Sequence, residues 1–251
     1  MKIGILGATG PAGSGLAARL SAVGFEVWVG SRSKYRAMEV VDGISDKWSD
    51  HQLNLHAGDN LDAARADVVV VATPWDAAAA TVMPLTDELA GKVVISMANA
   101  LAKVAHEFQP LVPPRGSVAA SIQAAIPKSL VSAAMHHVPA KELGDLAHPV
   151  ESDVLVCSDH EEATATTLDI INRIPDLRPL DAGELSNAAP IEAFAAVLLQ
   201  LNVKYRTRAA VRFTGIDPEA RRVSTKPGAK PAKPAKAPAQ AASAASEAEP
   251  G

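Results

Sequence analysis

The chain has 251 residues and a mass of 26.0 kDa, with 48% hydrophobic and 21% charged residues, a composition typical of globular proteins. Its single cysteine, Cys157, excludes an internal disulfide and a cysteine-based zinc site, and we expect no bound metal. Aromatic residues make up only 4% of the chain, which argues against a surface that stacks nucleic-acid bases. Because the sequence holds neither a long apolar run nor an apolar leader with a cleavage site, we expect a cytoplasmic protein without a membrane span.

The formal net charge of −4 is unevenly distributed along the chain. Residues 221–251 hold six Lys or Arg and two Glu, a net +4, so the preceding residues carry −8. An acidic body argues against a nucleic-acid partner. From residue 226 onward the chain contains only Lys, Pro, Ala, Ser, Gly, Gln and Glu, which cannot supply a core, and we expect this tail to be disordered.

Strand-like and helix-like segments alternate in the first hundred residues. Strands are expected at 2–6, 26–30, 53–56, 66–73 and 92–97, and helices at 11–23, from 34, and at 76–89. Unbroken apolar strands alternating with helices predict an α/β fold, a Rossmann-like doubly wound parallel sheet. In the second half, strands are expected at 130–135 and 153–158 and helices at 161–173 and 189–205. We therefore expect a nucleotide-binding domain at 1–125, a smaller C-terminal domain at 126–220 and a tail at 221–251.

The strongest chemical signal is a glycine-rich loop between the first strand and the first helix. It comprises Gly7, Ala8, Thr9, Gly10, Pro11, Ala12 and Gly13. In this pattern the first glycine permits a tight turn, the second allows the backbone to approach a diphosphate, and the third allows the helix to pack on the strand. The helix N-terminus then attracts the anion. The loop predicts a dinucleotide-binding site.

The end of the second strand indicates which dinucleotide is bound. NAD-binding proteins usually carry Asp or Glu about 20 residues beyond the glycine loop, whereas this strand ends in Gly30, Ser31 and Arg32. No carboxylate is present to repel a 2′-phosphate, and the Arg32 guanidinium is suited to bind one, with Arg36 as a second cation one helical turn later. We therefore predict NADP.

Two further observations concern the reaction. Thr73, Pro74 and Trp75 follow the fourth strand, at the carboxyl edge where doubly wound folds bind ligands. Neither tyrosine is followed four residues later by lysine, so the proton donor of short-chain dehydrogenases is missing. A hydride acceptor that brings its own reactivity would explain this absence.

The motifs together resemble one family, the NADPH-dependent reductases of coenzyme F420, which is an 8-hydroxy-5-deazaflavin. The resemblance spans about residues 1–216 and rests on the glycine loop, on residues 29–32 and 73–75, and on two more specific segments, residues 135–140 (Met-His-His-Val-Pro-Ala) and residues 178–187 (Arg-Pro-Leu-Asp-Ala-Gly-Glu-Leu-Ser-Asn).

The resemblance implies a hydride transfer between NADP(H) and coenzyme F420 by a homodimer whose second half caps the nucleotide domain and completes the deazaflavin site. The residues that it implies for NADP are Thr9, Ala12, Ser31, Arg32, Arg36, the loop 73–75 and the backbone at Ala98. For the deazaflavin ring it implies His136, His137, Val138 and Pro139, with His136 as the residue that contacts the reacting ring. Met97 to Ala100 depart from relatives that carry proline there.

Two alternatives remain open. One is an NADP-dependent reductase of a small carbonyl or imine compound, for which only His136, His137 or Lys204 would be available as proton donor. The other is a non-catalytic NADP-binding redox sensor, which needs no second cofactor pocket. The sensor would leave residues 136–140 and 178–187 unexplained.

Overall fold

The computed structural model describes residues 1–216. Residues 1–212 form one compact unit, and 213–251 form a second, of which only 213–216 are described. The tail expected at 221–251 lies outside the described residues.

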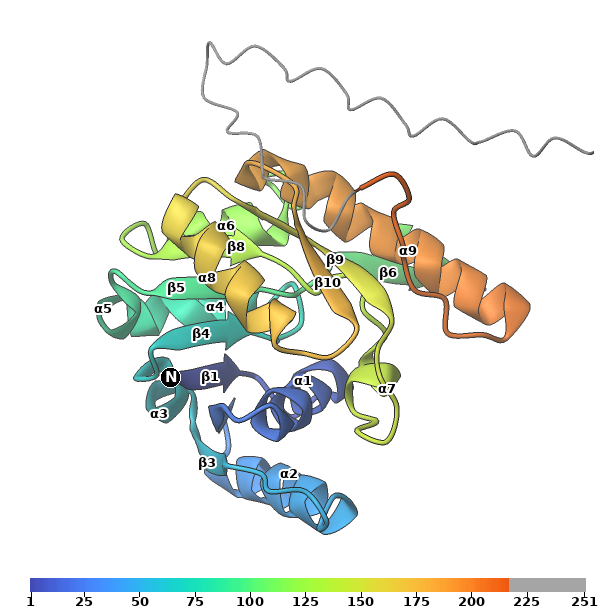
Figure 1. Cartoon of the computed structure of the whole chain (residues 1–251). Coiled ribbons are helices and arrows are strands. Elements are labelled where there is room, and N and C mark those ends of the chain that lie inside the picture. Colours follow the sequence, from blue (N-terminus) through green and yellow to red (C-terminus); the bar gives the residue numbers. More distant parts are fainter. Residues whose placement is uncertain (217–251) are drawn as a thin grey trace, which may run out of the picture. The chain divides into compact units, whose positions relative to one another are not determined.

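Eight strands form one sheet in the order β10-β9-β8-β5-β4-β1-β2-β3 (Figure 1). The strands are β1 (Lys2–Leu6), β2 (Glu26–Ser31), β3 (Leu55–Asp59), β4 (Val68–Val71), β5 (Val93–Ser96), β8 (Leu130–Ala133), β9 (Ser152–Ser158) and β10 (Leu177–Asp181). The six strands from β3 to β8 are parallel, and their order is that of the Rossmann fold, which confirms the predicted doubly wound sheet.

The second half of the chain continues this sheet. β9 pairs antiparallel with β8, and β10 pairs parallel with β9. The boundary expected near residue 125 therefore falls between a helix and β8, inside the same sheet and the same compact unit.

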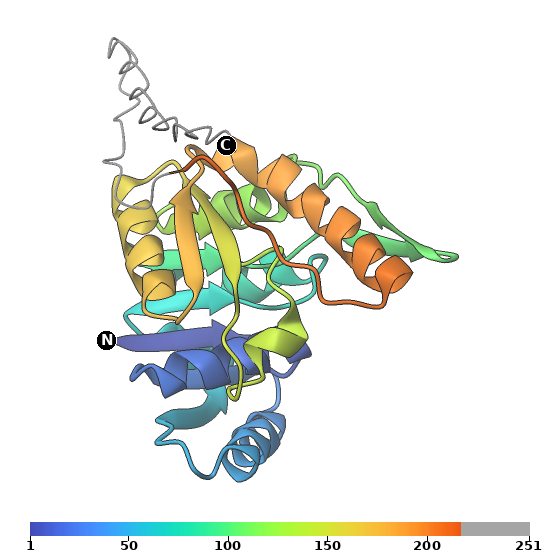
Figure 2. The ribbon, with the colours of Figure 1, turned by 45° about the vertical axis from the view of Figure 1, so that its right-hand side comes forward.

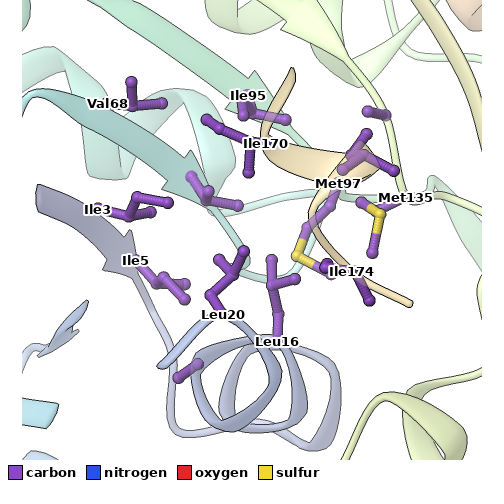
Figure 3. Packing of buried hydrophobic residues seen from close by; sticks show 14 of the residues in the cluster. Ile3, Ile5, Leu16, Leu20, Val68, Ile95, Met97, Met135, Ile170 and Ile174 are labelled. Carbon is purple, nitrogen blue, oxygen red and sulfur yellow. The ribbon is translucent and has the colours of Figure 1, made fainter. Parts of the chain in front are cut away.

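Helices cover both faces of the sheet. On one face lie α1 (Pro11–Ala22), α2 (Lys34–Lys47) and α8 (Glu161–Asn172); on the other lie α3 (Asn60–Ala64), α4 (Ala78–Val82), α5 (Thr86–Leu89) and α6 (Val118–Ala125). Successive side chains of each strand point to opposite faces of the sheet and pack into two separate hydrophobic cores. Figure 3 shows Ile3 and Ile5 of β1 pointing toward Leu16 and Leu20 of α1. On the adjacent strand β4, Val69 and Val71, which pair with Gly4 and Leu6, face the second core. This arrangement leaves the carboxyl edge of the parallel strands for loops.

Several segments differ from the sequence-based expectation. The helix expected at 76–89 is divided into α4, a 3₁₀ turn (Met83–Leu85) and α5, because Pro84 cannot continue an α-helix. A two-stranded hairpin, β6 (Leu101–Val104) and β7 (Glu107–Pro110), was not predicted and lies outside the main sheet. β10, α6 and the short helix α7 (Ala140–Leu143) were not predicted either.

The long helix α9 (Ala188–Tyr205) follows a short 3₁₀ turn (Leu185–Asn187). It packs against α6 and β7, and Figure 2 shows it running beside the β6–β7 hairpin. Within residues 1–216, none of the helices combines the length and the apolarity that crossing a lipid bilayer requires.

Candidate functional site

The loops at the carboxyl edge of the parallel sheet are held in line by backbone hydrogen bonds from each loop to the neighbouring strand. The pairs are Ala8 N to Gly30 O (3.0 Å), Ala72 N to Leu6 O (3.0 Å), Met97 N to Val71 O (3.2 Å) and Ala134 N to Ser96 O (3.0 Å). These bonds place the start of the glycine loop, the loop after β4, the loop after β5 and the loop after β8 side by side. All the residues predicted to bind cofactor lie on these loops, at the end of β2 or at the start of the helices that follow.

The glycine loop has the tight geometry that its sequence predicts. Gly7 has a φ of 70°, and a Cβ there would lie 2.4 Å from Thr73 Cγ2. A Cβ at Gly13 would lie 2.8 Å from Ala8 Cα, so α1 packs closely on the loop. A Cβ at Gly10, by contrast, would meet no described atom within 4 Å. Since Gly10 is the N-cap of α1 and has no side chain to bond the first-turn N–H groups, the helix N-terminus is available to an anion.

The end of β2 places one buried hydroxyl beside two exposed cations. Ser31 is buried, and its Oγ accepts a hydrogen bond of 3.2 Å from the N–H of Ser33. Ser33 in turn caps α2 by accepting from the N–H of Arg36. Arg32 and Arg36 are exposed, and neither guanidinium has a carboxylate partner within residues 1–216. Two unpaired guanidinium groups at the strand end suit a doubly charged phosphate.

The loop after β4 contacts the glycine loop through Thr73, whose side chain lies against Gly7. The Thr73 Oγ1 is buried and has no hydrogen-bond partner in the described part of the chain. Pro74 is exposed, and Trp75 is partly buried against the core that contains α4. Part of the Trp75 ring therefore supports the fold.

A pocket of about 180 Å³ lies where the loop after β8 meets α1 and α9. Its lining is mostly apolar with a few polar groups, the usual character of a small-molecule site. The lining residues are Ala12, Met97, Asn99, residues 135–140, Ala195, Leu198, Leu199 and Asn202. Of the residues predicted to bind cofactor, Ala12 and residues 136–139 line this pocket. The other predicted residues lie outside its lining, along the same sheet edge.

His136 and His137 are the two titratable groups that line this pocket, and both are buried, with relative exposures of 5% and 4%. Burial and the neighbouring His137 lower the pKa of His136 to about 3, and the carbonyls of Ala98 and Met97 oppose this shift. Neither ring nitrogen makes a hydrogen bond of normal geometry within residues 1–216. His136 is therefore a neutral imidazole at physiological pH, with one donor and one acceptor nitrogen.

The backbone before His136 is strained. Met135 has a φ of 66°, a left-handed conformation that non-glycine residues rarely adopt and that costs about 1–2 kcal/mol. Met135 is itself buried, so the surrounding core holds the turn in place. Such strain persists where the position of the following side chain matters.

His137 faces a buried charge network in the C-terminal half. Burial lowers the His137 pKa to about 4, and Asp153 opposes the shift. Asp153 is fully buried and accepts two hydrogen bonds from Arg178, at 2.7 and 2.6 Å, and one of 3.2 Å from Arg212. Arg178 therefore pairs with Asp153, although it belongs to residues 178–187, one of the segments that carry the family resemblance.

The described residues contain no group of three or more His, Cys, Asp or Glu that could hold a metal ion.

The α9 wall of the pocket was not predicted as part of the site. The sequence places Ile191, Phe194, Leu198 and Leu201 on one packing stripe, but Phe194 and Leu201 are exposed, at 36% and 37%. Small residues such as Ala195 carry no chemical signal in a sequence. Asn99 has no predictive signal for a different reason. It follows β5 in residues 97–100, and the distinguishing feature of that segment is the absence of the proline that some relatives carry.

Together these features define a dinucleotide-binding α/β protein with a largely apolar pocket next to the start of its glycine-loop helix. Known proteins share both the sequence and the fold. Residues 2–100 match the family model described as NADP oxidoreductase, coenzyme F420-dependent. The F420-dependent NADP reductase of Methanocaldococcus jannaschii is 36% identical over 223 residues, covering 86% of this chain and 100% of that protein. The enzyme of the same name from Methanothermobacter marburgensis is 32% identical and covers 86% of this chain and 99% of its own length.

A solved structure agrees. The crystal structure of a proposed F420-dependent NADP reductase from Arthrobacter sp. FB24 superposes with a TM-score of 0.70 at 25% identity, covering 83% of this chain and 96% of that one. The chain belongs to the family of F420-dependent NADP reductases, which confirms the resemblance inferred from the motifs.

Proposed function

We propose that this protein is an oxidoreductase that transfers a hydride reversibly between NADP(H) and coenzyme F420. The observation that carries the proposal is the pocket beside α1. It adjoins the predicted dinucleotide site, it is largely apolar, and it holds buried polar atoms without partners in residues 1–216, namely on His136, His137 and Asn99. The names of the relatives support the same reaction.

For NADP, we propose that the diphosphate binds the N-terminus of α1 along the loop from Gly7 to Gly13. The open space around Gly10 and the uncapped helix start support this assignment. We propose that Ser31, Arg32 and Arg36 bind the 2′-phosphate, since two exposed guanidinium groups flank a buried hydroxyl there. Thr9, the loop 73–75 and the Ala98 backbone complete the NADP site in this proposal.

For the deazaflavin, we propose that the ring system binds against His136, His137, Val138 and Pro139. When both cofactors are bound, NADPH supplies the hydride and the deazaflavin accepts it at a ring carbon. The protein then has to orient the two rings and exclude water, for which a largely apolar pocket is suited. Because burial keeps His136 neutral, its ring would donate or accept a hydrogen bond without carrying a charge.

The absence of an obvious general acid agrees with this assignment. A carbonyl reductase needs a proton donor beside the nicotinamide, and the pKa values of His136 and His137 are lowered to about 3 and 4. Two imidazoles that are neutral at pH 7 are poor proton donors. Lys204, the other candidate donor, is exposed and does not line the pocket. The pocket therefore favours a hydride acceptor that needs no protein proton.

The deciding experiment follows oxidised F420 with NADPH by the loss of deazaflavin visible absorbance, using the full chain. We expect NADPH-dependent reduction, and re-oxidation when NADP⁺ is added to reduced F420. If NADPH binds but F420 is not reduced, the proposal fails. Turnover of a carbonyl or imine compound would then favour a small-substrate reductase, and NADPH binding alone would favour a redox sensor.

We also propose that the protein is a homodimer in the cytoplasm and that α9 lies in the interface. Apolar side chains on α9 are exposed, including Val197 at 51%, Val203 at 56% and Tyr205 at 67%. Val104 and Val112, on and after the adjacent hairpin, are exposed at 48% and 83%. Adjacent exposed apolar side chains of this kind mark association surfaces.

A further inference from the structure

Asn99 occupies the turn between β5 and the hairpin. The turn begins where Met97 N donates to Val71 O over 3.2 Å and ends where β6 starts at Leu101. Asn99 is half-buried and lines the pocket together with His136 and Ala12. Its side chain thus lies where the loop after β5, the loop after β8 and α1 come together.

The orientation of the Asn99 amide is fixed by chemistry. Its Nδ2 lies 2.7 Å from the backbone carbonyl oxygen of His136. A carbonyl oxygen can only accept, so the amide nitrogen must be the atom that faces it. The other arm of the amide, Oδ1, is therefore the free acceptor.

The Oδ1 atom is buried and receives no hydrogen bond within residues 1–216. A buried acceptor without a donor is costly, and native structures rarely keep one unless a ligand or water supplies the donor. Both ring nitrogens of His136 are in the same condition. The pocket therefore presents an acceptor that selects a ligand with an N–H group.

If the proposed function is correct, the part of the bound cofactors that lies at this turn is the nicotinamide end of NADP. The lining residue Ala12 lies in the first turn of α1, next to the proposed diphosphate site, and Asn99 follows the strand beside β4. The carboxamide NH₂ is the only N–H donor of the nicotinamide ring. We propose that Asn99 Oδ1 accepts a hydrogen bond from this NH₂ group, which makes Asn99 the residue that recognises the carboxamide. Its Nδ2 bond to His136 O couples that recognition to residues 135–140, against which the deazaflavin is proposed to bind.

The test compares NADP⁺ with its 3-acetylpyridine analogue, in which a methyl group replaces the carboxamide NH₂. Equilibrium binding of both to the full chain is measured by calorimetry for the wild type and for Asn99→Ala. We expect the wild type to prefer NADP⁺ by about 5- to 10-fold, the effect of one hydrogen bond. We expect Asn99→Ala to bind both within about 2-fold. For each protein, the ratio of the two dissociation constants is compared. A displacement of the turn that weakens the binding of both ligands equally cancels in this ratio.

Asn202→Ala is the matched control. Asn202 lines the same pocket from α9, but its Oδ1 already accepts from Ala209 N, so the preference for NADP⁺ is expected to stay at the wild-type value. Equal affinity of the wild type for both ligands, or an unchanged preference in Asn99→Ala, overturns the inference. A higher KM for F420 in Asn99→Ala with an unchanged preference also overturns it and assigns the acceptor to the deazaflavin. Failure of wild-type NADP⁺ binding would instead refute the proposed function.

Discussion

The Nη2 of Arg19 on α1 donates a hydrogen bond to the backbone carbonyl oxygen of Glu142 on α7, 2.6 Å away. The same guanidinium also donates to the carbonyls of Leu143, Asp145 and His148. These carbonyls lie at and after the end of α7, where a helix leaves acceptors unsatisfied and favours a cation. Arg19 is only 5% exposed. One buried side chain thus ties the helix of the glycine loop to the segment that follows residues 136–139.

Arg19→Met is expected to destabilise the fold by about 2–4 kcal/mol, because it leaves one buried and three partly buried carbonyls without this donor. Urea unfolding should show a lower midpoint with an unchanged slope. The deazaflavin KM should rise more than the NADPH KM, since α7 adjoins the proposed deazaflavin site.

The matched control is Arg173→Met. Arg173, at the C-cap of α8, pairs with Asp169 at 3.6 Å, with side chains 56% and 65% exposed, and its guanidinium lies 5.1 Å from the centre of the Phe25 ring. An exposed ion pair and an exposed cation–π contact each contribute little, so a change of about 1 kcal/mol or less is expected, smaller than that of Arg19→Met. Equal effects of the two substitutions would show that Arg19 has no special role.

The parallel part of the sheet was predictable because its signals are local. The run of four valines at 68–71 predicts a strand, and the glycine loop predicts a tight turn, each from adjacent residues alone. The pocket was not predictable in this way. Its α9 wall is made of residues such as Ala195, and its polar character depends on the Asn99 amide meeting the His136 carbonyl, 37 residues away.

Capping residues show the same limit. Asn is a residue type that favours helix N-caps, and Asn187 stands at the N-cap of α9, but its side chain donates to the Ala182 carbonyl over 2.6 Å and makes no cap bond. A residue type indicates that a helix starts nearby, while tertiary contacts decide which partner the side chain takes. Long-range partners of this kind carry no periodic signal.

Ser31→Asp is expected to reverse the cofactor preference. A carboxylate at the end of β2 repels the 2′-phosphate and accepts from a ribose 2′-hydroxyl. The ratio of kcat/KM for NADPH to that for NADH should fall by about 100-fold or more, equivalent to roughly 3 kcal/mol. An unchanged ratio would remove the end of β2 from the NADP site.

His136→Ala is expected to lower kcat for F420 reduction by about 10-fold through loss of one hydrogen bond in the pocket. Because the His136 pKa is about 3, the ratio of wild-type to variant kcat should stay constant between pH 5 and 8. A ratio that changes near pH 6.5 would mean that the ring is charged during the reaction.

The same lowered pKa has a consequence for stability. The unfolded chain binds a proton at His136 below about pH 6.5, whereas the folded chain does not until about pH 3. The contribution of the neutral ring is fully present above pH 6.5 and is lost as the pH falls toward 3. His136→Asn should therefore unfold with less acid sensitivity than the wild type, as measured by urea unfolding at pH 5 and pH 7.5.

Val197→Glu tests the proposed interface on α9. Val197 is 51% exposed and lies one turn from Phe194 and Leu201, both partly exposed. A carboxylate buried at an interface without a partner weakens association, so the dimer dissociation constant should rise at least about 10-fold in sedimentation equilibrium. Met83→Glu, at a 60% exposed position after α4, should leave the constant unchanged. A wild-type protein that sediments as a monomer would contradict the dimer itself.

Glu192→Gln tests a buried carboxylate that joins α9 to α6. Glu192 is 3% exposed, and its two oxygens accept from the N–H groups of Val118 (2.8 Å) and Ala119 (3.1 Å) at the start of α6. Burial raises its pKa to about 7, against the opposing effect of those two hydrogen bonds. Between the unfolded value of about 4.5 and pH 7, the folded chain holds the proton more often than the unfolded chain does. Stability contributed by this group is therefore present below about pH 4.5 and is lost as the pH rises through 7.

The difference in unfolding free energy between the wild type and Glu192→Gln should consequently fall between pH 5 and pH 8, by up to about 3 kcal/mol. Urea unfolding of both proteins at the two pH values measures this difference. The pH-dependent contributions of the groups that titrate in both proteins cancel when the two free energies are subtracted. A difference that is the same at pH 5 and pH 8 would show that Glu192 stays ionised in the fold, its charge held by the α6 N-terminus. In that case the N–H groups of Val118 and Ala119 outweigh burial, and the carboxylate acts as a permanently charged cap that fixes the α9 wall of the pocket.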